Sequence, residues 1–283
     1  MRLLTFLAKR FVAGDNIEEA KEAVKKLNDQ GLLVTLDVLG ENVFSKEDAI
    51  KARDAYLNLL DVISRDKLNA NVSLKLTQMG LDIDTKFSAE NLREIVRKAK
   101  SYNNFVRVDM EGTPYTQKTL DVFFAVYKEF KGSVGIVIQA YLFRSEEDVK
   151  KLSEANIPVR LCKGAYKEPA LLAIKEMKDI QKNYMELSKK LLVNGGYPAF
   201  ATHDAKLIDD LKGYISEKNI PKEKFEFQML FGIRRKLAKK LADEGYKVRI
   251  YVPFGTHWLP YTLRRLRERK ENVFFVIKNL FTA

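Results

Sequence analysis

The densest group of side chains able to bind a ligand lies near the C-terminus, in the run Pro260-Tyr-Thr-Leu-Arg-Arg-Leu-Arg-Glu268. Proline is favoured in the first turn of a helix. On such a helix Tyr261, Arg264 and Arg265 fall on one face, which Glu268 extends by one turn. Two adjacent guanidinium groups beside a hydroxyl can hold a carboxylate through charge-assisted, bidentate hydrogen bonds. A basic surface helix with a local ion pair fits the same spacing, and the residues alone leave both interpretations open.

Further charged residues occur inside β-rich runs, where ionised side chains are unusual. NVSLKL at 71–76 contains Lys75, and FVRVDM at 105–110 contains Asp109. If both point inward from neighbouring strands, they can pair and hold a polar substrate group, although this is also a common structural ion pair. The run Arg160-Leu-Cys-Lys-Gly-Ala-Tyr166 ends another strand with a glycine, which either admits a ligand close to the backbone or makes a turn.

The elements that must position these residues alternate regularly along the chain. Ser45 and Ser145 are predicted helix N-caps, because each precedes an acidic residue at the third helical position. Eight βα units predict an α/β fold, a (β/α)8 barrel at 31–283 preceded by helices within 1–30 and forming one domain with them. The absence of any Gly-x-Gly motif disfavours an open dinucleotide-binding sheet. The β-rich runs are 32–39, 71–76, 105–110, 134–142, 158–164, 198–202, 225–230 and 248–255.

Each strand can be divided into two faces, and the more polar face is expected to line the barrel interior. Ordinary barrels fill the interior with Val, Ile and Leu, because buried charge is costly unless it is paired or bound to a ligand. The sequence therefore predicts an interior built around a polar ligand, with an internal lattice of salt bridges as the alternative. The inward residues are Thr35, Asp37, Asn71, Ser73, Lys75, Arg107, Asp109, Gln139, Arg160, Thr202, Glu226, Gln228, Arg249 and Tyr251.

Composition removes several classes of protein. The single cysteine, Cys162, cannot form an internal disulfide, which suits a cytoplasmic location, and no apolar run approaches the roughly 18 to 20 residues of a membrane-spanning helix. With His203 and His257 as the only histidines, no metal site is expected. Nucleophile-elbow and phosphate-loop motifs are missing as well. The net charge of +12 is spread over the chain, which favours a solvated lysine-rich surface over a nucleic-acid partner.

Seven motifs, in order, resemble those of the proline dehydrogenase family and extend over nearly the whole chain. They lie at 10–14, 109–112, 160–166, 201–204, 226–232, 251–255 and 261–265. The resemblance implies a distorted (β/α)8 barrel whose last helix lies over the C-terminal ends of the strands. It also implies FAD bound without a Gly-x-Gly-x-x-Gly motif. The flavin contacts carried over by position are Met110, Gln139, Arg160, Lys163, Gly164, Ala165, Thr202 and His203.

The same resemblance assigns the substrate site. Asp109 and Arg160 take the catalytic positions, and the implied reaction converts L-proline to Δ1-pyrroline-5-carboxylate. The resemblance implies that electrons then pass to a membrane quinone. Because the chain has neither the DNA-binding region nor the aldehyde dehydrogenase domain of the bifunctional proteins, a separate pyrroline-5-carboxylate dehydrogenase is expected to oxidise the product. The basic, amphipathic run at 1–11 suggests a peripheral membrane contact. The substrate contacts carried over are Lys75, Tyr251, Tyr261, Arg264 and Arg265, with Leu230 packing on the ring.

Two other functions remain to be weighed against this one. A barrel enzyme acting on a different small carboxylate would use the same arginine clamp. A nucleic-acid binder would rest on the net charge and on Arg264-Arg-Leu-Arg-Glu-Arg-Lys270. The second explains neither the polar interior nor the ordered motifs.

Overall fold

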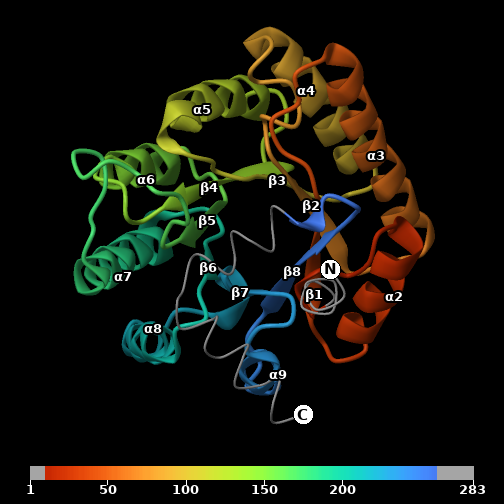
Figure 1. Ribbon diagram of the computed structural model, residues 1–283. Coiled ribbons are helices and arrows are strands. Elements are labelled where there is room, and N and C mark those ends of the chain that lie inside the picture. Colours follow the sequence, from red (N-terminus) through yellow and green to blue (C-terminus); the bar gives the residue numbers. More distant parts are fainter. Residues whose placement is uncertain (1–9, 260–283) are drawn as a thin grey trace.

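The computed structural model describes residues 10–259, and these form a closed barrel of eight parallel strands in the order β1 to β8 (Figure 1). The predicted (β/α)8 barrel is confirmed. Each strand lies within its predicted run or one residue outside it, which shows that the β-rich composition was a sufficient local signal. The strands are β1 (Leu33–Val38), β2 (Ala70–Leu74), β3 (Val106–Val108), β4 (Val134–Gln139), β5 (Val159–Cys162), β6 (Ala199–Ala201), β7 (Glu226–Leu230) and β8 (Val248–Phe254).

Helices surround the barrel on its outside, as Figure 1 shows. One of them, α2, precedes β1 and contacts both β1 and β8, in agreement with the predicted N-terminal helix. The bounds are α2 (Ile17–Asn28), α3 (Lys46–Arg65), α4 (Thr85–Ser101), α5 (Thr113–Tyr127), α6 (Ser145–Glu154), α7 (Met177–Asn194), α8 (Ala205–Glu217), the short 3-10 helix η1 (Lys222–Lys224) and α9 (Arg235–Asp243).

One predicted N-cap is confirmed and the other is wrong. The Ser45 hydroxyl accepts a hydrogen bond from the Asp48 N–H at the start of α3. Ser145 is instead the first residue of α6, and its hydroxyl donates to the Gln139 carbonyl at the end of β4. The serine thus satisfies a buried strand carbonyl, which the local capping pattern did not reveal.

The strand register supports the predicted division into faces, with one exception. Ala199 and Ala201 of β6 pair with Arg160 and Cys162 of β5, so the small residues of β6 face the interior. Phe200 points to the helix layer, where it packs near Phe227. The assignment of Thr202 to the interior by strand parity is therefore wrong; it follows the end of β6 and is buried there.

Beside β8 the helix layer is incomplete within the described part of the chain. A cavity of about 590 Å³ lies there, lined by residues of α2 and α9 and by Ile250 of β8. A regular barrel would pack its eighth helix in this position. The expected placement of the last helix, and the single domain over 31–283, stay predictions because residues 260–283 lie outside the described residues. None of the helices between residues 10 and 259 combines the length and apolar character needed to cross a membrane.

Candidate active site

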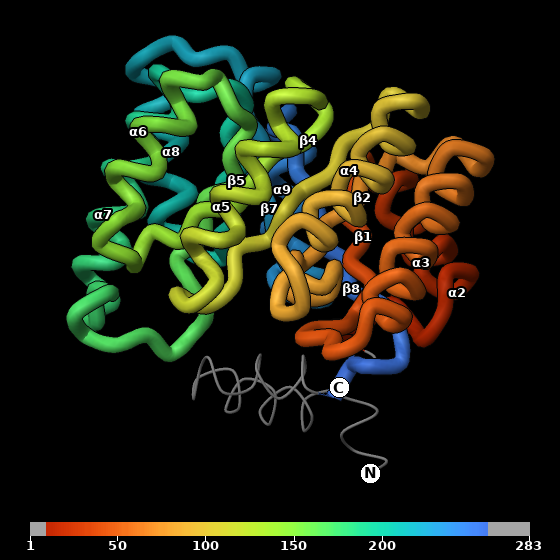
Figure 2. Tube along the Cα trace, turned by 90° about the horizontal axis from the view of Figure 1, so that it is seen from above, coloured from red at the N-terminus to blue at the C-terminus, as the bar shows by residue number. Residues whose placement is uncertain are grey.

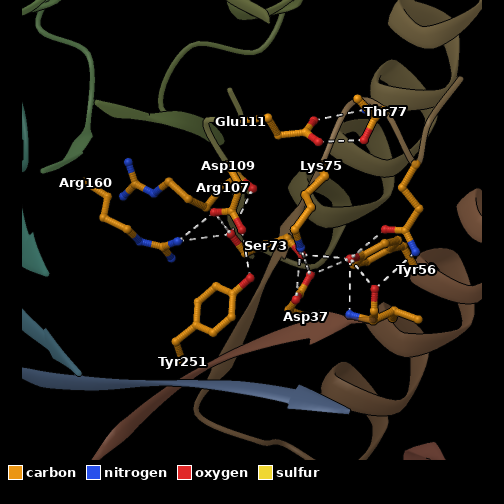
Figure 3. A network of polar contacts seen from close by, with 12 residues as sticks. Asp37, Tyr56, Ser73, Lys75, Thr77, Arg107, Asp109, Glu111, Arg160 and Tyr251 are labelled. Atoms are coloured by element: carbon orange, nitrogen blue, oxygen red, sulfur yellow. Dashed lines mark hydrogen bonds and ion pairs between the residues drawn. The ribbon is translucent and has the colours of Figure 1, made fainter. Parts of the chain in front are cut away.

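A group of polar side chains fills the barrel interior toward the C-terminal ends of the strands, and we call it the upper cluster (Figure 3). It contains residues from β1, β2, β5 and β8, and two that directly follow β2 and β3. The C-terminal face is where barrels of this class carry their active sites. The members of the upper cluster are Asp37, Ser73, Lys75, Asp109, Arg160 and Tyr251, with Tyr56 of α3 reaching in from outside.

Asp109 is the centre of the upper cluster. Its Oδ1 accepts hydrogen bonds from Ser73 Oγ at 2.7 Å and from Arg160 Nη1 at 2.8 Å. Its Oδ2 accepts from the Tyr251 hydroxyl at 2.8 Å. Three donors, one of them cationic, converge on one carboxylate, which holds it in a fixed orientation.

Lys75 pairs with Asp37, and the prediction that it pairs with Asp109 is wrong. Its Nζ lies 3.2 Å from both carboxylate oxygens of Asp37, and both side chains are almost completely buried. The Tyr56 hydroxyl donates to the Ser73 carbonyl at 2.9 Å, and its oxygen lies 3.3 Å from Asp37 Oδ1. Burial raises the pKa of Asp37, and the charge of Lys75 offsets this only in part.

Arg160 contacts Asp109, Ser73 and Tyr251 within the upper cluster. Its guanidinium lies 5.3 Å from the centre of the Tyr251 ring and also donates to Ser73. Its Nε is buried and has no hydrogen-bond partner among residues 10–259. A buried N–H of this kind costs free energy unless a ligand accepts from it. Arg160 Nε is therefore a buried polar atom that the described residues leave unsatisfied.

The residues predicted to contact a cofactor follow the ends of neighbouring strands. Gln139 closes β4 and donates to the Glu111 carbonyl at 2.9 Å. Lys163 follows β5 and pairs with Asp204 at 2.8 Å. His203 follows β6 and accepts from the Leu230 N–H at 2.8 Å. Together they make an arc along one side of the barrel mouth.

The glycine of the β5 motif has an observable structural cause. Gly164 has φ +117°, and a Cβ there would meet the Tyr141 ring at 2.4 Å. The backbone thus approaches the Tyr141 ring, which follows β4, and this close approach is sufficient to require glycine.

The other predicted contacts differ in burial. Ala165 is half-buried after Gly164, and Met110 is buried after β3. Tyr261, Arg264 and Arg265 lie outside the described residues.

The sequence did not predict two residues of the site, Tyr56 and Glu111. Tyr56 lies on the buried face of α3, and its amphipathic pattern looks like ordinary core packing. Glu111 accepts from both the hydroxyl and the N–H of Thr77. Burial raises the pKa of Glu111 to about 6, against the opposing effect of these hydrogen bonds. The only indication of Glu111 in the sequence is its position two residues after Asp109.

Comparison with known proteins gives a consistent answer. The family model described as proline dehydrogenase matches residues 20–278. The chain belongs to the proline dehydrogenase family. Members of this family are oxidoreductases that oxidise proline in the first step of its catabolism, and they are flavoenzymes.

Individual proline dehydrogenases match over almost their full length. The chain is 42% identical to proline dehydrogenase 1 of Bacillus subtilis (strain 168), covering 96% of this chain and 90% of that protein. It is 40% identical to the proline dehydrogenase of Deinococcus radiodurans, covering 97% and 90%. The crystal structure of proline utilization A from Bdellovibrio bacteriovorus inactivated by N-propargylglycine superimposes with a TM-score of 0.88 at 31% identity. That match covers 94% of this chain and 33% of the longer protein.

This proline dehydrogenase chain contains a second polar group deeper in the barrel, which we call the lower cluster. It consists of Arg107, Tyr197, Glu226, Gln228 and Arg249, close to the N-terminal ends of the strands. Arg249 forms a bidentate pair with Glu226, with distances of 2.7 and 3.1 Å, and donates to the Val34 carbonyl. Arg107 donates to the carbonyls of residues 136 and 158. The lower cluster is thus satisfied by the protein itself.

Proposed function

We propose that the chain oxidises L-proline to Δ1-pyrroline-5-carboxylate, with FAD as the hydride acceptor and a membrane quinone as the final electron acceptor. The observation that carries the proposal is the upper cluster, in which Asp109 is fixed by three donors beside a buried, unpartnered Arg160 Nε within the described chain. A polar site at the catalytic face of a barrel, with a buried N–H that has no acceptor among residues 10–259, suits a bound cofactor and a small polar substrate.

The residues that follow β3 to β6 would hold FAD. Arg160, within β5, would join them. Its buried Nε–H has no acceptor in the described chain, and a bound flavin would supply one, so the site fits the cofactor. When bound, FAD supplies the hydride acceptor and the protein supplies binding and orientation. Gln139, Lys163 and His203 are already held by neighbouring residues, so the arc needs little rearrangement to receive a ligand. The proposed contacts are Met110, Gln139, Arg160, Lys163, Gly164, Ala165, Thr202 and His203.

The proposed proline site lies over the upper cluster. Lys75, Asp109 and Tyr251, labelled in Figure 3, would bound it from below. Leu230 at the end of β7 would pack against the ring. Tyr261, Arg264 and Arg265 would hold the carboxylate from above. Fixing the carboxylate and the ring together makes hydride loss from C5 a positioned step rather than a chance encounter.

The proline nitrogen must be neutral during the reaction, because only a free lone pair can stabilise the developing iminium. Lys75 and Arg160 would disfavour a protonated amine above them to the extent that Asp37 and Asp109 leave their charge uncompensated. Asp109 is shared among three donors, so it anchors the site with its charge already neutralised in part by Arg160.

The partners follow from the proposed reaction. A membrane quinone would reoxidise the flavin, and a separate pyrroline-5-carboxylate dehydrogenase would consume the product. We propose a cytoplasmic enzyme with a peripheral contact at the inner face of the membrane, to which the run at 1–11 would contribute. No nucleic-acid partner is proposed.

The test is the visible spectrum of the purified protein under anaerobic conditions, before and after addition of L-proline. A flavin absorption band that bleaches with proline is the expected result. A band that stays unchanged with proline but bleaches with another small carboxylate would move the substrate assignment. Failure to take up FAD at all would contradict the proposed cofactor.

A further inference from the structure

Four large apolar side chains are exposed on two segments that follow β4 and β5, on the catalytic face. Leu171 is 90% exposed, Phe143 58%, Met177 52% and Leu172 46%. Phe143 belongs to the loop between β4 and α6, and the other three belong to the segment that joins β5 to the first residue of α7. We call these four residues the loop patch. A cluster of this kind on the surface usually marks a contact with a partner or a membrane.

The loop patch is built on a folded base. The Phe143 N–H donates to the Leu172 carbonyl at 3.1 Å, and Leu142 and Ala173 form a β-bridge. Beneath them a small separate core contains Tyr141, Leu142, Ala173 and Ile180. The two loops therefore bury one set of apolar side chains and hold the other set outward.

Exposed lysines occur in the same segment as the loop patch and in the first turns of α7. Lys167, Lys178 and Lys182 are exposed and form no salt bridge with any residue between 10 and 259. Elsewhere on the surface many lysines pair with a carboxylate one helical turn away, as Lys151 does with Glu147. Near Phe143, the exposed carboxylates Glu146 and Glu147 pair with Lys190 and Lys151. Two exposed carboxylates without a salt bridge among the described residues, Glu176 and Asp179, share the segment with the three lysines, which outnumber them. The third acidic residue, Glu168, is buried and its carboxylate is bound by Thr113.

The loop patch is continuous with the proposed cofactor site. The segment that carries Leu171 begins at Lys163 and Gly164, immediately after β5. In Figure 2 this loop, drawn in green, projects from the lower edge of the molecule. Loops that follow the strands of a barrel all open on its catalytic face.

We propose that the loop patch docks the catalytic face of the enzyme onto an anionic lipid bilayer. Leu171 and Phe143 would enter the interface between headgroups and acyl chains, and the three lysines would contact anionic headgroups. A projecting tip of apolar side chains bordered by cations fits a bilayer, which yields to it, better than a protein, which would need a matching groove. Lipid binding stands independently, whereas delivery of electrons to a quinone at this surface rests on the proposed function.

The direct experiment is co-sedimentation of the full chain with vesicles of phosphatidylglycerol or of phosphatidylcholine. Leu171→Glu removes an apolar contact and adds a repelled charge, so binding to phosphatidylglycerol vesicles should fall roughly tenfold or more. The matched control is Val193→Glu. Val193 is 63% exposed on the same helix α7, about 24 Å along its axis from Met177, and this variant should bind as the wild type does.

The lysines are tested separately from the apolar residues. Lys178→Gln and Lys182→Gln should each weaken binding to phosphatidylglycerol vesicles about fivefold and leave binding to phosphatidylcholine unchanged. Wild-type protein that does not sediment with phosphatidylglycerol vesicles overturns the proposal. It is equally overturned if Leu171→Glu binds as well as Val193→Glu, since another surface would then make the contact.

A second readout separates this proposal from the proposed function. Leu171→Glu should keep wild-type rates of proline-dependent reduction of a soluble dye, while proline-dependent reduction of a quinone inside phosphatidylglycerol vesicles falls in proportion to the lost binding. Equal loss with both acceptors would contradict docking as the cause. If proline reduces neither acceptor in the wild type, the proposed function fails, but the vesicle-binding result still decides whether the loop patch binds lipid.

Discussion

The lower and upper clusters both place charged side chains inside the barrel. They differ in whether every buried polar atom has a hydrogen-bond partner among the described residues. In the lower cluster, Glu226 and Arg249 satisfy each other in a bidentate pair, and Gln228 donates to the same carboxylate. In the upper cluster, Asp109 is also saturated, yet the Nε of Arg160 has no acceptor among the described residues. The lower cluster thus completes its own hydrogen bonds, whereas the upper cluster leaves one buried nitrogen atom unsatisfied within the described chain.

The pKa values of the buried carboxylates also differ between the lower and upper clusters. Burial acts to raise the pKa of Glu226, but the charge and hydrogen bonds of Arg249 outweigh it and lower that pKa. For Asp37 burial prevails and its pKa is raised. The salt-bridge lattice considered as an alternative for the whole interior therefore describes the lower cluster, whereas a ligand site is our proposal for the upper one.

The largest expected effect is on the free energy of unfolding, when the ion pair of the lower cluster is broken. Glu226→Ala leaves Arg249 buried without its partner, which should lower the free energy of unfolding by about 3–5 kcal/mol. Chemical denaturation measures this. The double variant Glu226→Leu with Arg249→Met should recover most of the loss, because it removes both charges. If the single variant is as stable as the wild type, the lower cluster is not a structural pair.

Replacing the Arg160 guanidinium by an ammonium group should affect catalysis more than stability. Arg160→Lys keeps the positive charge near Asp109 but has no Nε–H, so the rate of flavin reduction by proline should fall about a hundredfold, or roughly 2.7 kcal/mol. Rapid-mixing spectroscopy gives this rate. Denaturation of the same variant without cofactor should show little change. A large loss of stability with an unchanged rate would place Arg160 with the lower cluster.

The raised pKa of Glu111 should make stability depend on pH. Because the folded protein holds this proton up to a pKa of about 6, the contribution of Glu111 is most favourable below the ordinary value of 4.5 and declines as pH rises to about 6. The full change should be ~2 kcal/mol. Urea unfolding at several pH values should show this decline in the wild type relative to Glu111→Gln. Parallel pH curves for the two proteins would contradict it.

The cations of the upper cluster should produce the smallest effect, on the pH profile of activity. The rate of flavin reduction should rise above neutral pH, since the proline amine must be neutral, and then reach a plateau. Lys75→Met removes one cation and should move the midpoint of this rise upward by about one pH unit or less. Stopped-flow measurements over a range of pH provide the profile. A flat wild-type profile would show that the amine charge does not limit the reaction.

The sequence was sufficient where the signal was local. β-rich runs gave the eight strands to within a few residues at each end, and the alternation of side chains placed Asp37, Lys75, Asp109, Arg160 and Tyr251 in the interior. It failed at Thr202, because β6 is only three residues long and alternation over so short a run has no redundancy. The motifs gave the family, which the comparisons confirm.

Pairing across the interior was decided only by the tertiary structure. Lys75 is near both Asp37 and Asp109 in a strand diagram, and the register of the closed barrel determines that it reaches Asp37 while Arg160 reaches Asp109 from β5. Tyr56 joins the same network from a helix, through the wall of the barrel. Strand composition and side-chain alternation are properties of short segments, so the sequence determines them. Contacts between distant segments depend on how all eight strands close, and only the folded barrel fixes that closure.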